Sequence, residues 1–174
     1  MFKDKKILVT GGTGMIGRQL VGLLHGLGAK IRVVSLDTPE GLPQGTEFLK
    51  LNLNSFENCL KACEGMEMVF SLVGIKSSAG IVQKRPASIF VPMILFNTNM
   101  MEAARVSGVK RYLYTSTNGV YGPAEVFHED DVWKSFPSEK FVRVKGEVSL
   151  APVDVSNITK RSTPRQQASV GFFC

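Results

Sequence analysis

The sequence predicts an α/β fold built on a doubly wound parallel sheet of at least five strands, with helices on both faces. Short apolar runs alternate with stretches whose apolar residues recur at helical spacing. Strands joined by connections of helix length are typical of parallel sheets. The first, fourth and fifth apolar runs are almost uninterrupted, as expected for central strands that are buried on both sides.

The strands are expected at regular intervals along the first two thirds of the chain. The predicted strands cover residues 6–10, 31–36, 47–51, 68–73 and 111–115. A sixth strand is predicted over residues 153–158, and a short helix over residues 139–150.

Three longer helices are expected between these strands. The first ends at Gly28, because glycine accepts the positive φ that follows a helix without strain. The second has Asn54 as its N-cap and ends at Gly65. The third is predicted to begin near Pro92, since proline is tolerated in a first turn, and to stop at Gly108.

Hydrophobic residues make up 44% of the chain, an ordinary share for a globular protein. No apolar run approaches the roughly 18 residues that cross a bilayer. The longest covers residues 89–96 and contains Pro92. The first residues lack the pattern of a signal peptide. We therefore expect a cytoplasmic location and no membrane partner.

The formal net charge is +6. Such a balance can indicate nucleic-acid binding. The lysines and arginines, however, are scattered through the first 145 residues, and only Lys160, Arg161 and Arg165 cluster, in a polar tail. This distribution favours a solvated surface with a loose basic tail and no nucleic-acid partner.

The three cysteines are Cys59, Cys63 and Cys174. They form neither a CxxC pair nor a cluster with histidine, so we expect no metal site. Two half-buried thiols in a reducing compartment are the simpler interpretation.

A glycine-rich turn follows the first strand directly and opens the first helix. Gly11 allows the sharp turn, Gly14 allows the backbone to approach a pyrophosphate, and Gly17 allows the helix to pack closely on the strand. The N-terminus of the helix offers N–H groups and a partial positive charge to phosphate. The pattern therefore predicts a dinucleotide-binding Rossmann unit. Its expected cofactor-binding residues are Gly11, Thr13, Gly14, Met15, Ile16 and Gly17.

An acidic residue follows the second strand. Asp37 lies 20 residues after Gly17, where a carboxylate accepts hydrogen bonds from the adenosine ribose. A carboxylate there also repels a 2′-phosphate, so the sequence favours NAD over NADP. Arg32 is the nearest cation that could argue otherwise, but it lies inside the strand.

The spacing G-x-x-G-x-x-G, together with Asp37 and the segment TSTNGVYG at residues 115–122, resembles the extended short-chain dehydrogenase/reductases. Within them it is most similar to the NAD-dependent epimerase/dehydratase group, which includes UDP-galactose 4-epimerase. The resemblance implies an isomerase or oxidoreductase that transfers a hydride between a sugar carbon and NAD. It also implies a nucleotide-sugar substrate and a homodimer, because family members commonly pair through helices that flank the active site.

The resemblance also assigns roles to two loops. Asn52 and Leu53 take the place of the family's Asp-Leu, which sits by the adenine. The loop of Leu72, Val73, Gly74 and Lys76 corresponds to the segment beside the NAD ribose and nicotinamide. Lys76 would then point toward a phosphate, although an exposed loop lysine fits the sequence equally well.

The catalytic residues implied by the resemblance are Thr117 and Lys145. Thr117 would hydrogen-bond the sugar hydroxyl or keto group, although a turn threonine satisfying backbone groups is the alternative. Lys145 would hold the nicotinamide ribose. The tyrosine of the family's Tyr-x-x-x-Lys motif is replaced by Phe141, which cannot transfer a proton. The chain is therefore either an enzyme of this family or a catalytically impaired NAD-binding fragment or regulatory module.

Two regions are predicted. Residues 1–147 form an NAD-binding Rossmann domain, and residues 148–174 form a divergent polar tail. The tail does not resemble the family's smaller substrate domain, so we expect the chain to lack that domain, as a truncated family member would.

Overall fold

The structure is a computed structural model, and it describes residues 1–75, 85–115, 126 and 169–173. The strands are β1 (Lys6–Thr10), β2 (Lys30–Ser35), β3 (Glu47–Lys50), β4 (Met68–Ser71), β5 (Arg111–Thr115) and β6 (Ser169–Phe173). The helices are α1 (Met15–Gly26), α2 (Phe56–Cys63) and α4 (Pro86–Val106).

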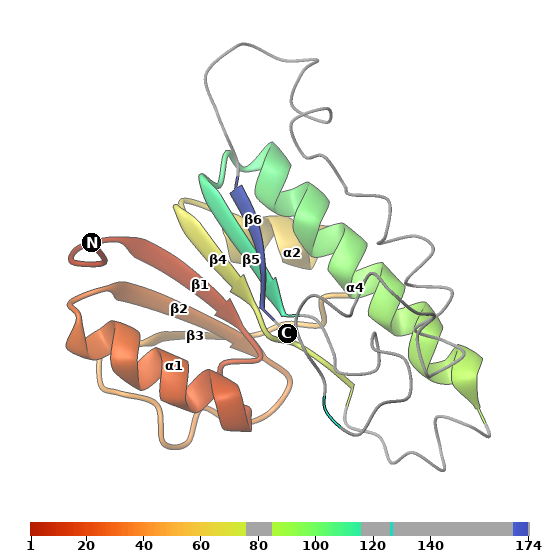
Figure 1. The fold of residues 1–174 in the computed structure, drawn as a ribbon, viewed down its shortest axis with the longest axis horizontal. Helices are drawn as coiled ribbons and strands as arrows, with labels where there is room; N and C mark the ends of the chain where they lie inside the picture. Colours follow the sequence, from red (N-terminus) through yellow and green to blue (C-terminus); the bar gives the residue numbers. More distant parts are fainter. Residues whose placement is uncertain (76–84, 116–125, 127–168, 174) are drawn as a thin grey trace.

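All six described strands belong to one parallel sheet in the order β3-β2-β1-β4-β5-β6. Helix α1 covers one face, and α2 and α4 cover the other (Figure 1). The order reverses between β1 and β4: α1, the helix after β1, lies on one face of the sheet, and α4, the described helix after β4, lies on the other. A crevice at the carboxyl ends of the strands is expected at such a switch point. The predicted doubly wound Rossmann-type fold is therefore confirmed.

The core has two halves because successive side chains of a strand point to opposite faces. Ile7 and Val9 of β1 pack toward α1, against Val21 and Leu24. Leu8 packs toward the other face, where α2 and α4 close the second cluster. The central strand β1 is thus apolar at every position from residue 7 to residue 9, as the uninterrupted run predicted.

Helix α4 begins at Pro86, not near Pro92 as predicted, and Pro92 lies inside it. An internal proline removes one helical hydrogen bond and crowds the preceding turn. The helix nevertheless continues, because Ile89 in the extra turn is buried, as is Phe96 beyond the proline. Burial of side chains on both sides of Pro92 offsets the local cost of an internal proline. The sequence pattern had instead indicated that the helix starts at this proline.

The start of α2 also differs from the prediction. Ser55, not Asn54, is the N-cap, and its Oγ accepts a hydrogen bond from Asn58 N at 3.5 Å. Asn54 instead donates its backbone N–H to Asn52 Oδ1 at 3.0 Å. Asn54 is thus held in the turn that begins at Asn52, and the next residue, Ser55, takes the cap position.

The sixth strand of the sheet was not foreseen at its observed position. The prediction over residues 153–158 and the helix over residues 139–150 lie outside the described residues. Strand β6 is formed by Ser169–Phe173, within the segment 148–174, and pairs in parallel with β5. Among the described residues, no helix combines the length and the apolar character needed to cross a membrane.

Cys59 and Cys63 lie one turn apart on α2, and both are fully buried, not half-buried. Burial raises the pKa of Cys59 to about 11 and that of Cys63 to about 12. Among the described residues, no group of three or more histidine, cysteine, aspartate or glutamate side chains could hold a metal ion.

These two thiols are expected to resist modification while the chain is folded, because the thiolate is the reactive form. In a Cys174→Ser variant, a disulfide reagent at pH 8 should label both thiols only at the rate of unfolding. In denaturant both should react quickly. Fast labelling under native conditions would contradict the burial seen here.

Candidate dinucleotide-binding site

A cavity of about 560 Å³ opens at the carboxyl ends of β1, β2 and β4. The structure brings together twelve of the predicted cofactor-binding residues in its wall. These are Gly11, Thr13, Gly14, Met15, Ile16, Gly17, Asp37, Asn52, Leu53, Leu72, Val73 and Gly74. Lys76, Thr117, Phe141 and Lys145 lie outside the described residues.

The turn after β1 requires glycine at its first position. Gly11 has a φ of +69°, which a residue with a side chain rarely adopts. A Cβ at this position would lie 3.0 Å from the backbone N and Cα of Val73. The Gly11 N–H donates to Val34 O at 2.8 Å. The turn therefore touches the ends of both neighbouring strands, which brings three wall segments of the cavity together.

The predicted close packing of α1 also depends on glycine. A Cβ on Gly17 would lie 2.6 Å from the Cα of Gly12, too close for any side chain. Gly12 in turn leaves room for Val33, since its own Cβ would meet Val33 Cγ1 at 2.8 Å. The sequence analysis predicted a packing role for Gly17 but none for Gly12, although both glycines lie in the same turn.

The N-terminus of α1 faces the cavity without a side-chain cap. Gly14 is the N-cap residue, no side chain of the described residues bonds to the cap, and the first turn contains no acidic residue. The first N–H groups of a helix have no partner within the helix. A Cβ on Gly14 would meet only Gly11 O, at 3.2 Å. This helix end is therefore open to an anion.

Three polar side chains connect the glycine turn to the end of β2. Thr13 and Ser35 are nearly fully buried, and their hydroxyl oxygens lie 2.7 Å apart. The Asp37 N–H donates to Ser35 Oγ at 3.2 Å, and Thr13 Oγ1 donates to Asp37 Oδ2 at 3.4 Å. This chain of hydrogen bonds holds the exposed Asp37 at the rim of the cavity. Ser35 was missed by sequence reasoning, although its place two residues before Asp37 is a usable signal.

Arg32 does not reach the cavity. Its Nε donates to Glu47 Oε2 at 2.8 Å, and its Nη1 donates to the carbonyls of Ala62 at 3.0 Å and Glu64 at 2.8 Å. The guanidinium thus caps the C-terminal end of α2. Among the described residues, Asp37 is the only charged side chain in the cavity wall.

The remaining wall is mostly apolar. Asn52 uses its amide oxygen in the turn before α2, which leaves its amide nitrogen as a donor near the cavity. Beside Leu72 and Val73, the wall includes Pro92 and Phe96 of α4. The sequence analysis placed Pro92 at the start of a helix and gave Phe96 no role at a site, because their position at the cavity depends on how α4 crosses the sheet.

A glycine turn, an open helix N-terminus and an acidic residue after β2 all face one cavity, which is the arrangement typical of Rossmann domains that bind nucleotides. The sequence profile of the NAD dependent epimerase/dehydratase family matches residues 7–145. The chain belongs to this family, as the resemblance indicated.

Individual relatives agree with this assignment. GDP-mannose 3,5-epimerase of Arabidopsis thaliana is 28% identical over 149 residues, which are 80% of this chain and 40% of the plant protein. UDP-glucose 4-epimerase of Thermotoga maritima, solved with UDP-glucose, is 27% identical with a TM-score of 0.68, over 84% of this chain and 50% of that one. UDP-glucose 4-epimerase of Thermus thermophilus, solved with NAD, is 23% identical with a TM-score of 0.72, over 93% and 57%. The chain thus spans 40% of the length of the plant relative.

Proposed function

We propose that this chain binds NAD(H) and forms the cofactor-binding half of a nucleotide-sugar epimerase or dehydratase. The observation that carries the proposal is the single cavity in which the glycine turn, Asp37 and the loop after β4 meet. The relatives solved with NAD and with UDP-glucose support the choice of cofactor and substrate class. We also propose a cytoplasmic location and, as the family resemblance implies, a homodimer.

The residues present fit NAD. The open N-terminus of α1 would hold the pyrophosphate, and the absence of a Cβ at Gly14 would allow it to approach. Asp37 would accept hydrogen bonds from the adenosine ribose, with Thr13 and Ser35 fixing its position. The Asn52 amide nitrogen would donate to the adenine ring. Leu72, Val73 and Gly74 would contact the nicotinamide end, with Lys76 directed to a phosphate.

Bound NAD would supply a hydride acceptor for a sugar carbon. Thr117 would orient the sugar hydroxyl, and Lys145 would hold the nicotinamide ribose. Phe141 offers no proton-transfer group where the family has tyrosine. We therefore infer that the chain binds NAD(H) but converts nucleotide-sugars slowly or not at all, as a catalytically impaired NAD-binding fragment or regulatory module would.

Cofactor binding is tested by titrating the purified chain with NADH and recording nicotinamide fluorescence. A saturable signal that ADP-ribose displaces is the expected result, because ADP-ribose shares the pyrophosphate and the ribose that the cavity would hold. A signal that stays linear in NADH concentration would rule out the proposed function.

Phe141→Tyr tests the catalytic part of the proposal. The substitution restores a group that can exchange a proton with a sugar hydroxyl, and general acid–base groups contribute about 10²–10⁴-fold to rate. Turnover of UDP- or GDP-sugars is therefore expected to rise by at least about tenfold over the unmodified chain. Full activity of the unmodified chain would refute the role given to the missing tyrosine. Inactivity of both would favour the fragment or regulatory module.

A further inference from the structure

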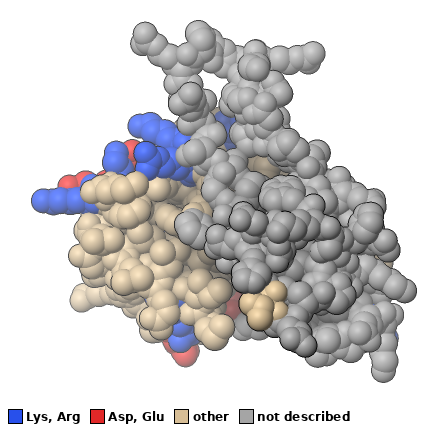
Figure 2. Space-filling view, in the orientation of Figure 1, with Lys and Arg blue, Asp and Glu red and all other residues tan. Residues whose placement is uncertain are grey.

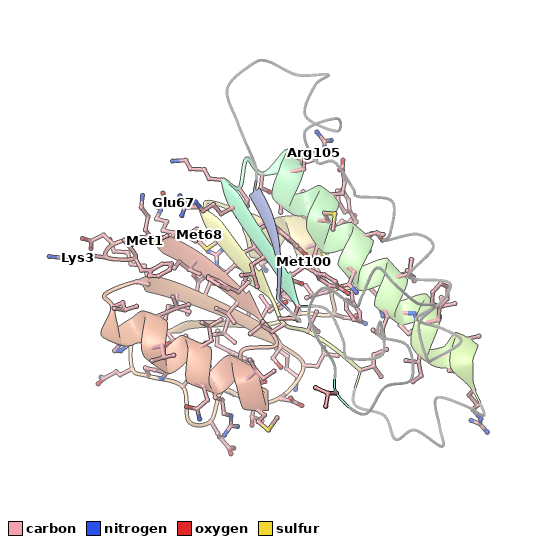
Figure 3. The ribbon with its side chains drawn as sticks, in the orientation of Figure 1. Met1, Lys3, Glu67, Met68, Met100 and Arg105 are labelled. Atoms are coloured by element: carbon pink, nitrogen blue, oxygen red, sulfur yellow. The ribbon has the colours of Figure 1, made fainter. Side chains whose placement is uncertain are left out.

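Cations that are scattered in the sequence gather at one edge of the sheet. In a parallel sheet all strands begin at the same edge, and several strands of this chain are preceded or opened by lysine or arginine. We call this set the basic edge, and it consists of Lys3, Lys5, Lys6, Lys30, Lys110 and Arg111. Figure 2 shows Lys and Arg atoms gathered on this side of the molecule. Figure 3 labels Lys3 and Glu67 on the same side.

Acidic residues at the basic edge are too few to neutralise it. Glu67 lies between two of the lysines, with its Oε2 2.9 Å from Lys5 Nζ and 3.7 Å from Lys110 Nζ. Asp4 and Glu64 are further exposed carboxylates near this edge, and Glu47, which opens β3, pairs with Arg32 at 2.8 Å. Among the described residues, neither Lys6 nor Lys30 forms a side-chain ion pair, and both are exposed. The six cations therefore outnumber Asp4, Glu64 and Glu67, which leaves a positive excess at this edge.

Two of these cations also face each other. Lys6 and Lys30 are direct partners in the register of β1 and β2. Like charges directly opposite each other on neighbouring strands destabilise a sheet. Glu67 lies on the other side of Lys6, with its Oε1 3.4 Å from the Lys6 N, and an external anionic surface would relieve the remaining repulsion.

Although the sequence led us to expect no membrane partner, we propose that the basic edge is a docking surface for a membrane that contains anionic phospholipids. Clusters of four to eight Lys or Arg residues attract such surfaces through their summed charge. Five of the six cations are lysines, whose compact charge suits a diffuse surface better than the paired geometry that arginine provides. Met1, 88% exposed on the same side, adds an apolar group beside the charges.

The opposite position of the cavity is consistent with this orientation. The cavity lies at the carboxyl ends of the strands, so a membrane at the basic edge leaves it open to small molecules. Nucleic acid fits the basic edge less well. Binding of single strands relies on exposed aromatic side chains for stacking. Among the described residues, the exposed large aromatic is Phe56, which begins α2 at the carboxyl side of the sheet.

The double variant Lys6→Gln/Lys30→Gln tests this assignment by co-sedimentation with phosphatidylcholine vesicles that contain phosphatidylserine. The unmodified chain is expected to bind these vesicles, to ignore pure phosphatidylcholine, and to dissociate as salt is raised. Each lysine removed should weaken binding about fivefold, so the double variant should lose more than about tenfold. Its Tm should stay equal or rise, because a like-charge pair has been removed.

The matched control is Lys50→Gln/Arg85→Gln, which removes the same charge from exposed positions at the carboxyl side of the sheet. This control should keep the vesicle affinity of the unmodified chain. Equal losses in both double variants would overturn the proposal, since net charge alone would then explain binding. Absence of binding to anionic vesicles, or tighter binding to single-stranded RNA than to the vesicles, would also overturn it.

Discussion

Gly17→Ala is expected to abolish saturable NADH binding and to lower the Tm by about 10 °C. The added Cβ would lie 2.6 Å from Gly12 Cα and 2.9 Å from Gly12 C. Both are backbone atoms that cannot rotate away, so α1 must move off β1. Overpacking of this kind costs about 3 kcal/mol. The same movement would displace the helix N-terminus from the cavity, which is why binding and stability should fall together.

Gly22→Ala is the matched control in the same helix. A Cβ at Gly22 would meet no atom within 4 Å, so alanine is expected to stabilise the chain by up to about 1 kcal/mol through its helix propensity. NADH affinity should not change. Both variants can be compared by thermal denaturation and by the fluorescence titration. A Gly17→Ala variant that keeps its Tm and its NADH affinity would show that the close contact with Gly12 is not needed.

Local patterns predicted the sheet well because central parallel strands are apolar on both faces. Strand β5 was predicted with its observed bounds, Arg111–Thr115. Prediction was poorer where tertiary packing competes with a local preference. Pro92 has the local preference of a helix start, but burial of Ile89 and Phe96 extends α4 through it. Strand β6 depends on pairing with β5, which no local pattern of residues 169–173 reveals.

The candidate site was predictable where backbone geometry dictates residue type. Gly11 and Gly17 are required by a positive φ and by a close contact, and both requirements are visible as glycines at fixed spacing. Ser35 and Phe96 were missed for a different reason. Their positions depend on the end of β2 and on the path of α4, and serine and phenylalanine fit many environments. Spacing also concealed the basic edge, because its three groups of cations, at residues 3–6, 30 and 110–111, come together only across strands.

Asp37→Ser should move the coenzyme preference from NADH toward NADPH. The carboxylate at the rim would otherwise repel a 2′-phosphate and accept hydrogen bonds from the ribose. Hydrogen bonds to charged groups contribute about 1.5–3 kcal/mol, so NADH affinity should fall by about tenfold or more. NADPH affinity should rise, because Arg18 is a cation close to this rim. Arg18 Nε donates to Thr13 O at 2.8 Å, and its Nη1 reaches toward the loop at Gly41.

Glu40→Gln separates this specific effect from a general loss of negative charge. Glu40 is exposed in the loop three residues after Asp37 and does not line the cavity. Its removal should change neither coenzyme affinity, whereas adding Arg18→Ala to Asp37→Ser should cancel the gain in NADPH binding. An Asp37→Ser variant with unchanged affinity for both coenzymes would mean that the ribose lies elsewhere. We do not expect the ribose to lie elsewhere, because the buried contact between Thr13 and Ser35 fixes the end of β2 against the glycine turn. This contact does not depend on the residue at position 37, so the substitution should leave the rim of the cavity in place.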